Sequence, residues 1–112
     1  MTHSLDALFA TIESRKGDLD SGKVGPETSY TAKLLAGGAP LIARKVGEEA
    51  VETAVAALTD DADAVVKESA DVLYHLMALW AHLGIAPDQV WAELDRRTGQ
   101  SGIEEKNSRP KG

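Results

Sequence analysis

Hydrophobic residues recur at helical spacing along most of this chain, and polar or breaker residues separate the stretches. Near the start, apolar residues three and four positions apart predict a short amphipathic helix that Ser4 caps and that fades at residues 15–17. Glycines, Pro26 and few apolar residues predict a loop over residues 17–28. A second short helix is expected over residues 29–36, and the glycines and proline that follow it require a change of chain direction.

Two long helices and a final short one complete the pattern. The first long helix is predicted over residues 41–58, where Gly47 is the only breaker. After a short connection, the next is expected from about residue 61 to residue 83, where Gly84 ends it, and a last helix starts at Pro87. Because the connection is so short, we expect the two long helices to form an antiparallel hairpin.

Composition favours a single all-α domain. The chain has 112 residues, of which 43% are hydrophobic and only 4% aromatic, so its core would consist of small aliphatic side chains that suit helix packing. We predict a small helical bundle around the central hairpin in residues 1–97, followed by a polar tail in residues 98–112. A domain of this size leaves apolar stripes exposed, so we expect a homodimer to complete the bundle.

Charge and missing residue types exclude several functions. A net charge of -6 argues against non-specific binding of nucleic acid. The absence of cysteine excludes disulfides, thiolate metal sites and a thiol nucleophile. No apolar run approaches membrane-spanning length, and the first ten residues lack the order of a signal peptide, so we expect a cytoplasmic protein without a membrane partner.

Each long helix carries a line of acidic residues beside a wide apolar surface. On the first helix, the narrow polar strip consists of Lys45, Glu48, Glu49 and Glu52. On the second helix, the corresponding strip consists of Glu68, Asp71, His75 and His82. Because the hairpin turns near residues 60 and 61, Glu49 and Glu52 are expected within one helical turn of Glu68 and Asp71.

Facing carboxylates repel one another, and the repulsion grows where water is limited. A cation that prefers oxygen ligands, such as Mg²⁺ or Mn²⁺, would turn this repulsion into attraction. The spacing therefore favours a metal site. Glu48 ranks below the other four acids, because it could ligate the metal, orient a water molecule or simply face solvent.

Other interpretations of these residues stay open at this point. The acids could merely solubilise a helical dimerisation or adaptor module. A di-metal carboxylate oxidase fits poorly, because neither His75 nor His82 follows a glutamate by three positions. His75 lies one turn beyond Asp71 and could support a metal ligand, although a lone histidine on a helix is more often structural.

The acidic motif resembles that of a known superfamily. Glu49-x-x-Glu52, followed after a short hairpin by Glu68-x-x-Asp71, is similar to the motif of the all-α nucleoside triphosphate pyrophosphohydrolases of MazG type. Three longer blocks make the likeness more specific, namely SYTAKLL at 29–35, KVGEEA at 45–50 and ESADVLYHL at 68–76. In this order and spacing they resemble the phosphoribosyl-ATP pyrophosphohydrolase family of histidine biosynthesis over nearly the whole chain.

This resemblance implies that a Mg²⁺-dependent homodimer, with Mn²⁺ as an alternative cation, hydrolyses phosphoribosyl-ATP to phosphoribosyl-AMP and pyrophosphate. The metal ligands that it implies are Glu49, Glu52, Glu68 and Asp71. Glu48 or Glu49 would accept a proton from the attacking water. Lys33 and Lys45 would bind phosphates, because both belong to the matched blocks. The alternative is a housekeeping pyrophosphatase of the same superfamily that acts on another nucleoside triphosphate.

Overall fold

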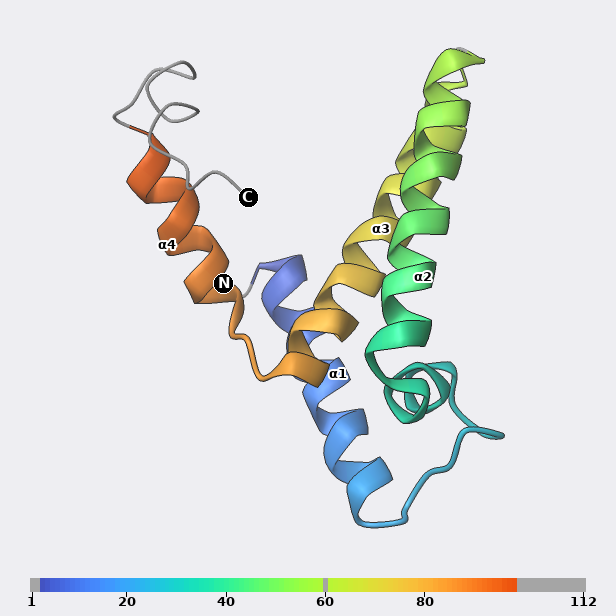
Figure 1. The fold of residues 1–112 in the computed structure, drawn as a ribbon, viewed down its shortest axis with the longest axis vertical. Helices are drawn as coiled ribbons and strands as arrows, with labels where there is room; N and C mark the ends of the chain where they lie inside the picture. The colour runs from blue at the N-terminus through green and yellow to red at the C-terminus, as the bar shows by residue number, and fades with distance from the viewer. Residues whose placement is uncertain (1–2, 60, 99–112) are drawn as a thin grey trace.

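The computed structural model of the chain describes residues 3–59 and 61–98. This part of the chain contains four helices and no strand, which confirms the predicted all-α class; the helices are α1 (Ser4–Asp20), α2 (Tyr30–Leu58), α3 (Ala62–Leu83) and α4 (Pro87–Arg97). In Figure 1, α2 and α3 lie side by side as a long hairpin, α1 lies against the lower part of α3, and α4 projects away from them. None of the described helices is long and apolar enough to cross a membrane. Apart from Thr98, the predicted polar tail lies outside the described residues.

The ends of the hairpin helices follow from local capping chemistry. A side-chain oxygen of Asp61 accepts a hydrogen bond of 3.0 Å from the backbone amide of Ala64 and starts α3. Gly84 ends α3 in the left-handed conformation, with φ 74°. Pro87 is the first residue of α4, where its missing amide hydrogen costs nothing. These boundaries confirm the predictions.

The predicted first helix is wrong at both ends. Its cap is His3 rather than Ser4, because the His3 ring accepts a hydrogen bond of 3.1 Å from the backbone amide of Leu5. The helix also continues three residues beyond Gly17, where the sequence predicts a loop. A glycine inside a helix costs about 1 kcal/mol relative to alanine. Next to this glycine, the ammonium group of Lys16 donates a hydrogen bond of 2.9 Å to the carbonyl of Ala81 and joins the end of α1 to the end of α3.

A sharp corner divides α2 into a first segment (residues 30–37) and a second segment (residues 39–58). The corner is Gly38, whose φ of 72° and ψ of -169° are not helical and belong to a region that is open essentially to glycine alone. The predicted change of direction is thus confirmed. Ser29 starts the first segment, because its hydroxyl accepts a hydrogen bond of 3.1 Å from the amide of Ala32.

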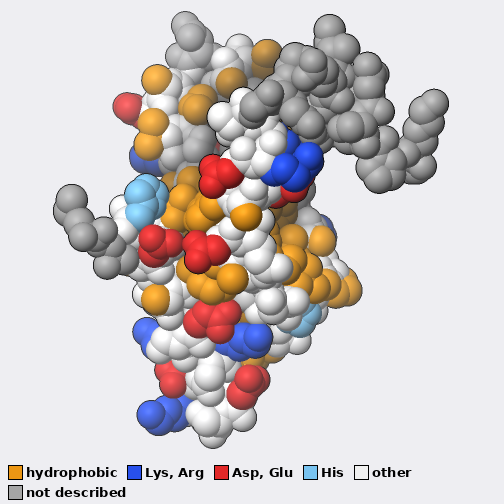
Figure 2. All heavy atoms as spheres, turned by 90° about the vertical axis from the view of Figure 1, so that its left-hand side faces the viewer, with side chains coloured by type: hydrophobic (Ala, Val, Ile, Leu, Met, Phe, Trp, Pro, Cys, Tyr) orange, Lys and Arg blue, Asp and Glu red, His pale blue; other side chains and the backbone are white. Residues whose placement is uncertain are grey.

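The core lies at the lower end of the hairpin. There, the carboxyl-terminal half of α3 contacts α1 and both sides of the corner in α2, and the buried residues form two small clusters, namely Ile12, Met77 and Ala81, and Leu34, Ile42 and Ala78. The upper part of the hairpin is barely covered, since Val51, Leu58 and Val66 are 63%, 86% and 69% exposed. Figure 2 likewise shows hydrophobic side chains open at the surface among acidic ones.

Candidate metal centre

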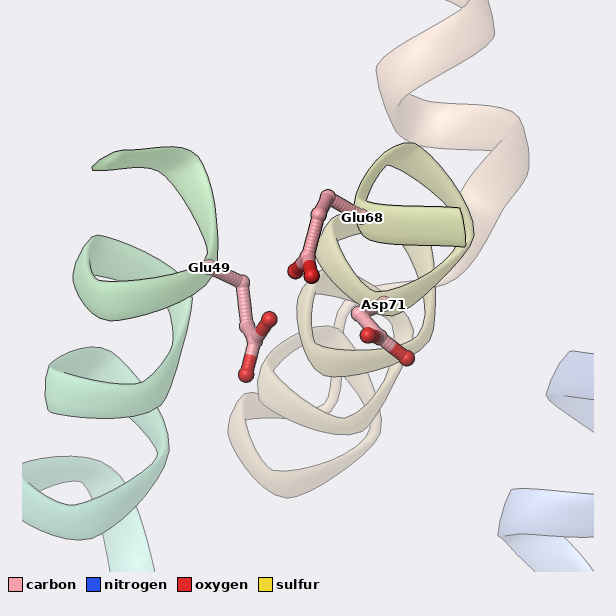
Figure 3. Close-up of side chains that lie close together, drawn as sticks. All are labelled: Glu49, Glu68 and Asp71. Atoms are coloured by element: carbon pink, nitrogen blue, oxygen red, sulfur yellow. The ribbon is translucent and has the colours of Figure 1, made fainter. Parts of the chain in front are cut away.

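The four acidic residues expected to face one another lie on adjacent surfaces of α2 and α3. Glu49, Glu68 and Asp71 each offer a carboxylate oxygen, and these three oxygens lie within 4.8 Å of one another. Figure 3 shows Glu49 reaching from α2 toward Glu68 on α3, with Asp71 one turn further along α3. Glu52 is close enough to Glu68 to share a proton with it. We call these four residues the carboxylate cluster; their roles stay a prediction.

Two oxygens of the carboxylate cluster have no hydrogen-bond donor. Glu49 Oε2 and Glu68 Oε2 are shielded from solvent, and no group within the described residues donates to them. The remainder of each of these side chains is half-buried, and Glu52 and Asp71 are exposed. Their close neighbours are other carboxylates, which accept hydrogen bonds and can join them only through an added proton. An ionised cluster of this kind requires positive charge from outside these residues.

The pKa values of the cluster reflect this crowding. A proton shared with Glu52 is the largest cause that raises the pKa of Glu68 to about 7, and burial and the neighbouring Glu49 add to the rise. The pKa of Glu49 is also raised, first by burial of its carboxylate, while a hydrogen bond with Glu68 opposes the rise and Glu52 and Asp71 add to it. Near neutral pH the cluster therefore retains a proton in the absence of a cation.

This chemistry fits a hard divalent cation. Every ligand atom that the cluster offers is a carboxylate oxygen, the type that Mg²⁺ and Mn²⁺ prefer, and the two shielded oxygens without donors would each gain a partner. The exposed positions of Glu52 and Asp71 leave one side open to water or to the oxygens of a ligand. The described residues thus form an acidic site that could hold a divalent metal ion.

Glu48, which the sequence suggests as a base, is not one of the carboxylates that come together in the described chain. Its two oxygens lie 3.4 Å from the guanidinium of Arg44 and 3.5 Å from the ammonium of Lys45. Such exposed pairs are weak, with a typical contribution of about 0–1 kcal/mol. The arrangement nevertheless separates two adjacent glutamates, because Glu48 faces cations whereas Glu49 faces Glu68.

The two predicted phosphate-binding lysines differ in position. The Lys45 ammonium pairs with Glu48 at 3.5 Å. Burial raises the pKa of the Tyr30 hydroxyl, and the charge of Lys45 opposes that rise. Lys33 is exposed on the first segment of α2, and no ion pair within residues 3–59 and 61–98 includes it. A role in phosphate binding stays a prediction for both.

A contact that the sequence pattern did not predict lies beside the cluster. The Tyr30 hydroxyl and His75 Nε2 are 2.9 Å apart, and His75 Nδ1 lies 2.7 Å from the carbonyl oxygen of Asp71. His75 is only 4% exposed, so this histidine is both buried and in contact with a member of the cluster. Tyr30 precedes His75 by 45 positions, and no helical spacing relates them. The signals in the sequence were that Tyr30 and His75 belong to the matched blocks at 29–35 and 68–76, and that His75 lies one turn beyond Asp71.

Comparisons with known proteins agree with the site. The model of a family described as phosphoribosyl-ATP pyrophosphohydrolase matches residues 19–98, which include the whole carboxylate cluster. The chain is 58% identical over 107 residues to the phosphoribosyl-ATP pyrophosphatase of Paramagnetospirillum magneticum, with 96% of this chain and 93% of the relative covered. It is 57% identical over 107 residues to the protein of the same name from Rhodospirillum rubrum, with 96% of this chain and 86% of the relative covered.

A third relative extends the similarity to the full length. The phosphoribosyl-ATP pyrophosphatase of Rhizorhabdus wittichii is 51% identical over 112 residues, which cover 100% of both chains. Identity at this level, together with a family match over most of the described helices, confirms the resemblance found in the three sequence blocks. The chain belongs to the phosphoribosyl-ATP pyrophosphohydrolase family.

Proposed function

We propose that this chain hydrolyses phosphoribosyl-ATP to phosphoribosyl-AMP and pyrophosphate, the second step of histidine biosynthesis. Membership of the family and the names of relatives that match over almost the whole chain support this activity. The observation that carries the proposal is the carboxylate cluster, because it offers the oxygen ligands with which a metal-dependent phosphoanhydride hydrolase can hold its cation.

The proposed cation is Mg²⁺, with Mn²⁺ as an alternative, and the proposed ligands are Glu49, Glu52, Glu68 and Asp71. When bound, the cation supplies positive charge that offsets the charge of the phosphate oxygens and of the leaving pyrophosphate. Without it, a chain with a net charge of -6 would repel a triphosphate. Lys45 and Lys33 are the proposed contacts to phosphates, as compact cations on flexible stems.

Of the two candidate bases, Glu49 is favoured over Glu48. Glu49 is one of the carboxylates that come together in the cluster, so its oxygens lie beside any water molecule held there and can accept a proton from it. Glu48 is instead paired with Arg44 and Lys45, and it would hold Lys45 in place beside the substrate. This assignment predicts that Glu49→Gln loses far more turnover than Glu48→Gln.

The substrate is tested by assaying the purified chain with phosphoribosyl-ATP and with a panel of nucleoside triphosphates, all with Mg²⁺. We expect kcat/KM for phosphoribosyl-ATP to exceed that for each other triphosphate. Slow turnover of phosphoribosyl-ATP together with faster turnover of another triphosphate would instead identify a housekeeping pyrophosphatase. Failure to hydrolyse any of these compounds would contradict both assignments.

We also propose that the active form is a homodimer. Val51 and Val55 on α2 are 63% and 53% exposed. A hollow of about 390 Å³ also lies between α2 and α3, lined by Ala50, Thr53, Ser69, Val72 and Leu73. A second copy that covers this surface would bury these side chains. Sedimentation equilibrium checks the proposal, and a monomer at assay concentrations would contradict it.

A further inference from the structure

Tyr30 combines an exposed ring with a hydroxyl in a fixed contact. Its side chain is 49% exposed, yet its hydroxyl lies 2.9 Å from the ring nitrogen of the buried His75. The ring also packs on Tyr74, with centroids 6.1 Å apart and planes inclined by 25°. These two contacts fix the position of the Tyr30 hydroxyl oxygen at the edge of the candidate site, although the ring itself is half exposed.

The direction of each hydrogen bond follows from the groups involved. The carbonyl oxygen of Asp71 can only accept, so His75 Nδ1, which is 2.7 Å away, carries the hydrogen and donates it. In the neutral imidazole the other nitrogen, Nε2, then has a free lone pair and must accept. The Tyr30 hydroxyl therefore donates its only hydrogen to His75. What the Tyr30 oxygen offers to any ligand is a lone pair, so it can accept a hydrogen bond but cannot donate one.

The surroundings of this oxygen indicate which donor is suitable. The geometric link from Tyr30 to the cluster is His75, whose ring joins the Tyr30 hydroxyl to the carbonyl oxygen of Asp71. Burial of the hydroxyl raises the pKa of Tyr30, Lys45 opposes the rise, and Tyr74, Glu49 and Asp71 add to it, so the phenol keeps its proton. A phosphate oxygen accepts hydrogen bonds and cannot bind an oxygen that offers only a lone pair. A water molecule has two hydrogens and can bind both the Tyr30 oxygen and a carboxylate of the cluster.

We propose that Tyr30 is a positioning residue for the hydrolytic water, an inference that rests on the proposed pyrophosphohydrolase function. The water donates one hydrogen to the Tyr30 oxygen and the other to a carboxylate of the cluster, which leaves its lone pairs directed at the substrate. The water oxygen then bonds to a phosphorus atom of the α,β-bridge, and the bond from that phosphorus to the bridging oxygen breaks. The carboxylate takes one proton from the water, and the leaving phosphate group takes the electron pair of the broken bond.

Removal of one phenol oxygen tests this proposal, and the chain offers a matched control. Tyr30→Phe deletes the hydroxyl but keeps the ring on Tyr74. Tyr74→Phe makes the same change on the neighbouring ring, whose hydroxyl bonds to Thr31. We expect Tyr30→Phe to lower kcat about fivefold to tenfold, the effect of losing one hydrogen bond to the reacting group, with KM within about twofold of the wild type. Tyr74→Phe should leave kcat unchanged.

Two further measurements do not depend on turnover. The increase in melting temperature caused by Mg²⁺ should be the same for Tyr30→Phe as for the wild type, because Tyr30 is not a proposed ligand. Imidazole ¹⁵N shifts should show His75 with hydrogen on Nδ1 and a lone pair on Nε2, and Tyr30→Phe should shift the Nε2 resonance alone. Hydrogen on Nε2 and none on Nδ1 would overturn the assignment of Tyr30 as an acceptor.

The remaining outcomes separate this inference from the proposed function. A rise in KM at constant kcat would mean that Tyr30 binds a hydroxyl group of the substrate, and equal losses in both phenylalanine variants would mean a structural role; either overturns the proposal. If the wild type hydrolyses a different triphosphate, the proposed substrate fails, and the same kcat comparison on that triphosphate decides the role of Tyr30. If no triphosphate is hydrolysed, both fail together.

Discussion

Two carboxylates in this molecule have close charged neighbours, with opposite consequences. Glu93 on α4 lies 2.6 Å from Arg96 and 3.0 Å from Arg97, and hydrogen bonds from Arg96 first and Arg97 second lower its pKa to about 2. Glu68 on α3 has Glu52 and Glu49 as neighbours, and its pKa is raised to about 7. The neighbours of Glu93 lie one turn along the same helix, whereas the neighbours of Glu68 lie on α2, across the hairpin.

The difference lies in whether the chain itself places groups of opposite charge beside the carboxylate. On α4, two guanidinium groups of the same chain offset the charge of the Glu93 carboxylate, and the basic residues also suit the negative end of the helix. In the carboxylate cluster the partners are all acids, so the ionised form is stable only with a cation from outside. The carboxylate cluster, whose partners are acids, is therefore the stronger sign of function. The ion pairs of Glu93 on α4 can be explained by stability and solubility alone.

The largest expected effect comes from removing one charge of the carboxylate cluster, with the same change on α4 as the control. Glu68→Gln should lower kcat/KM for phosphoribosyl-ATP by at least about 100-fold, because the proposed metal site loses a ligand. Glu93→Gln, the same change on α4, should stay within about twofold of the wild type, since it alters only exposed ion pairs. Steady-state kinetics of the two variants decide the matter, and similar losses in both would remove the distinction between the regions.

The next effect is on stability in the presence of metal. Mg²⁺ at about one hundred times its Kd should stabilise the folded wild type by about 2.7 kcal/mol, because it binds the folded chain and not the unfolded one. Glu52→Gln and Asp71→Asn should each remove most of this increase, whereas Glu93→Gln should retain it. Thermal melts with and without Mg²⁺ measure the increase. If neither Mg²⁺ nor the two substitutions change the melting temperature, the interpretation as an adaptor module would be favoured.

The smallest expected effect is the pH dependence of the metal-free protein. Below pH 4.5, the ordinary pKa, Glu68 is protonated in both the folded and the unfolded chain. Between 4.5 and about 7 only the unfolded chain loses the proton, so stability is lost as pH rises through the folded pKa of about 7. The melting temperature should thus fall by a few degrees from pH 5 to pH 8, less steeply in Glu68→Gln.

Glu93 serves as a control, because its pKa is shifted in the opposite direction from that of Glu68. Its pKa is lowered to about 2, so its contribution to stability is present above pH 4.5 and is lost only as pH falls toward 2. Glu93→Gln should therefore melt with the same slope as the wild type between pH 5 and pH 8. Equal slopes for wild type and Glu68→Gln would show that Glu68 does not titrate in this range.

The sequence predicted much of what depends on neighbours along the chain, although it missed the local cap at His3. The hairpin and its caps at Asp61 and Gly84 depend on a few adjacent residues, and helical spacing then places Glu49 opposite Glu68. The extension of α1 was missed because it depends on a bond from Lys16 to a carbonyl at the far end of α3. Contacts of this kind join residues with no periodic relation, and they follow only from the packed structure.

The same limit applies inside the site. The pattern ranked Glu48 below the other acids as a metal ligand, but it did not choose between Glu48 and Glu49 as the base, because both fell in the narrow polar strip. Their separation depends on where Arg44 and Lys45 direct their side chains. The contact between Tyr30 and His75 was missed because it requires the first segment of α2 to fold back on α3.

That fold-back depends on handedness at a single residue. The mirror image of the Gly38 conformation, φ 72° and ψ -169°, is an ordinary extended backbone, so the corner is what a D-amino acid would adopt without strain. Space is not the obstacle for an L-residue, because an added Cβ would meet only ordinary contacts at 3.8 Å, the nearest being to His82 and Pro40. In chemically synthesised protein, D-alanine at this position would suit the backbone that L-alanine strains. The corner that brings the first segment of α2 back to α3 thus depends on one residue that can adopt the backbone conformation of a D-amino acid.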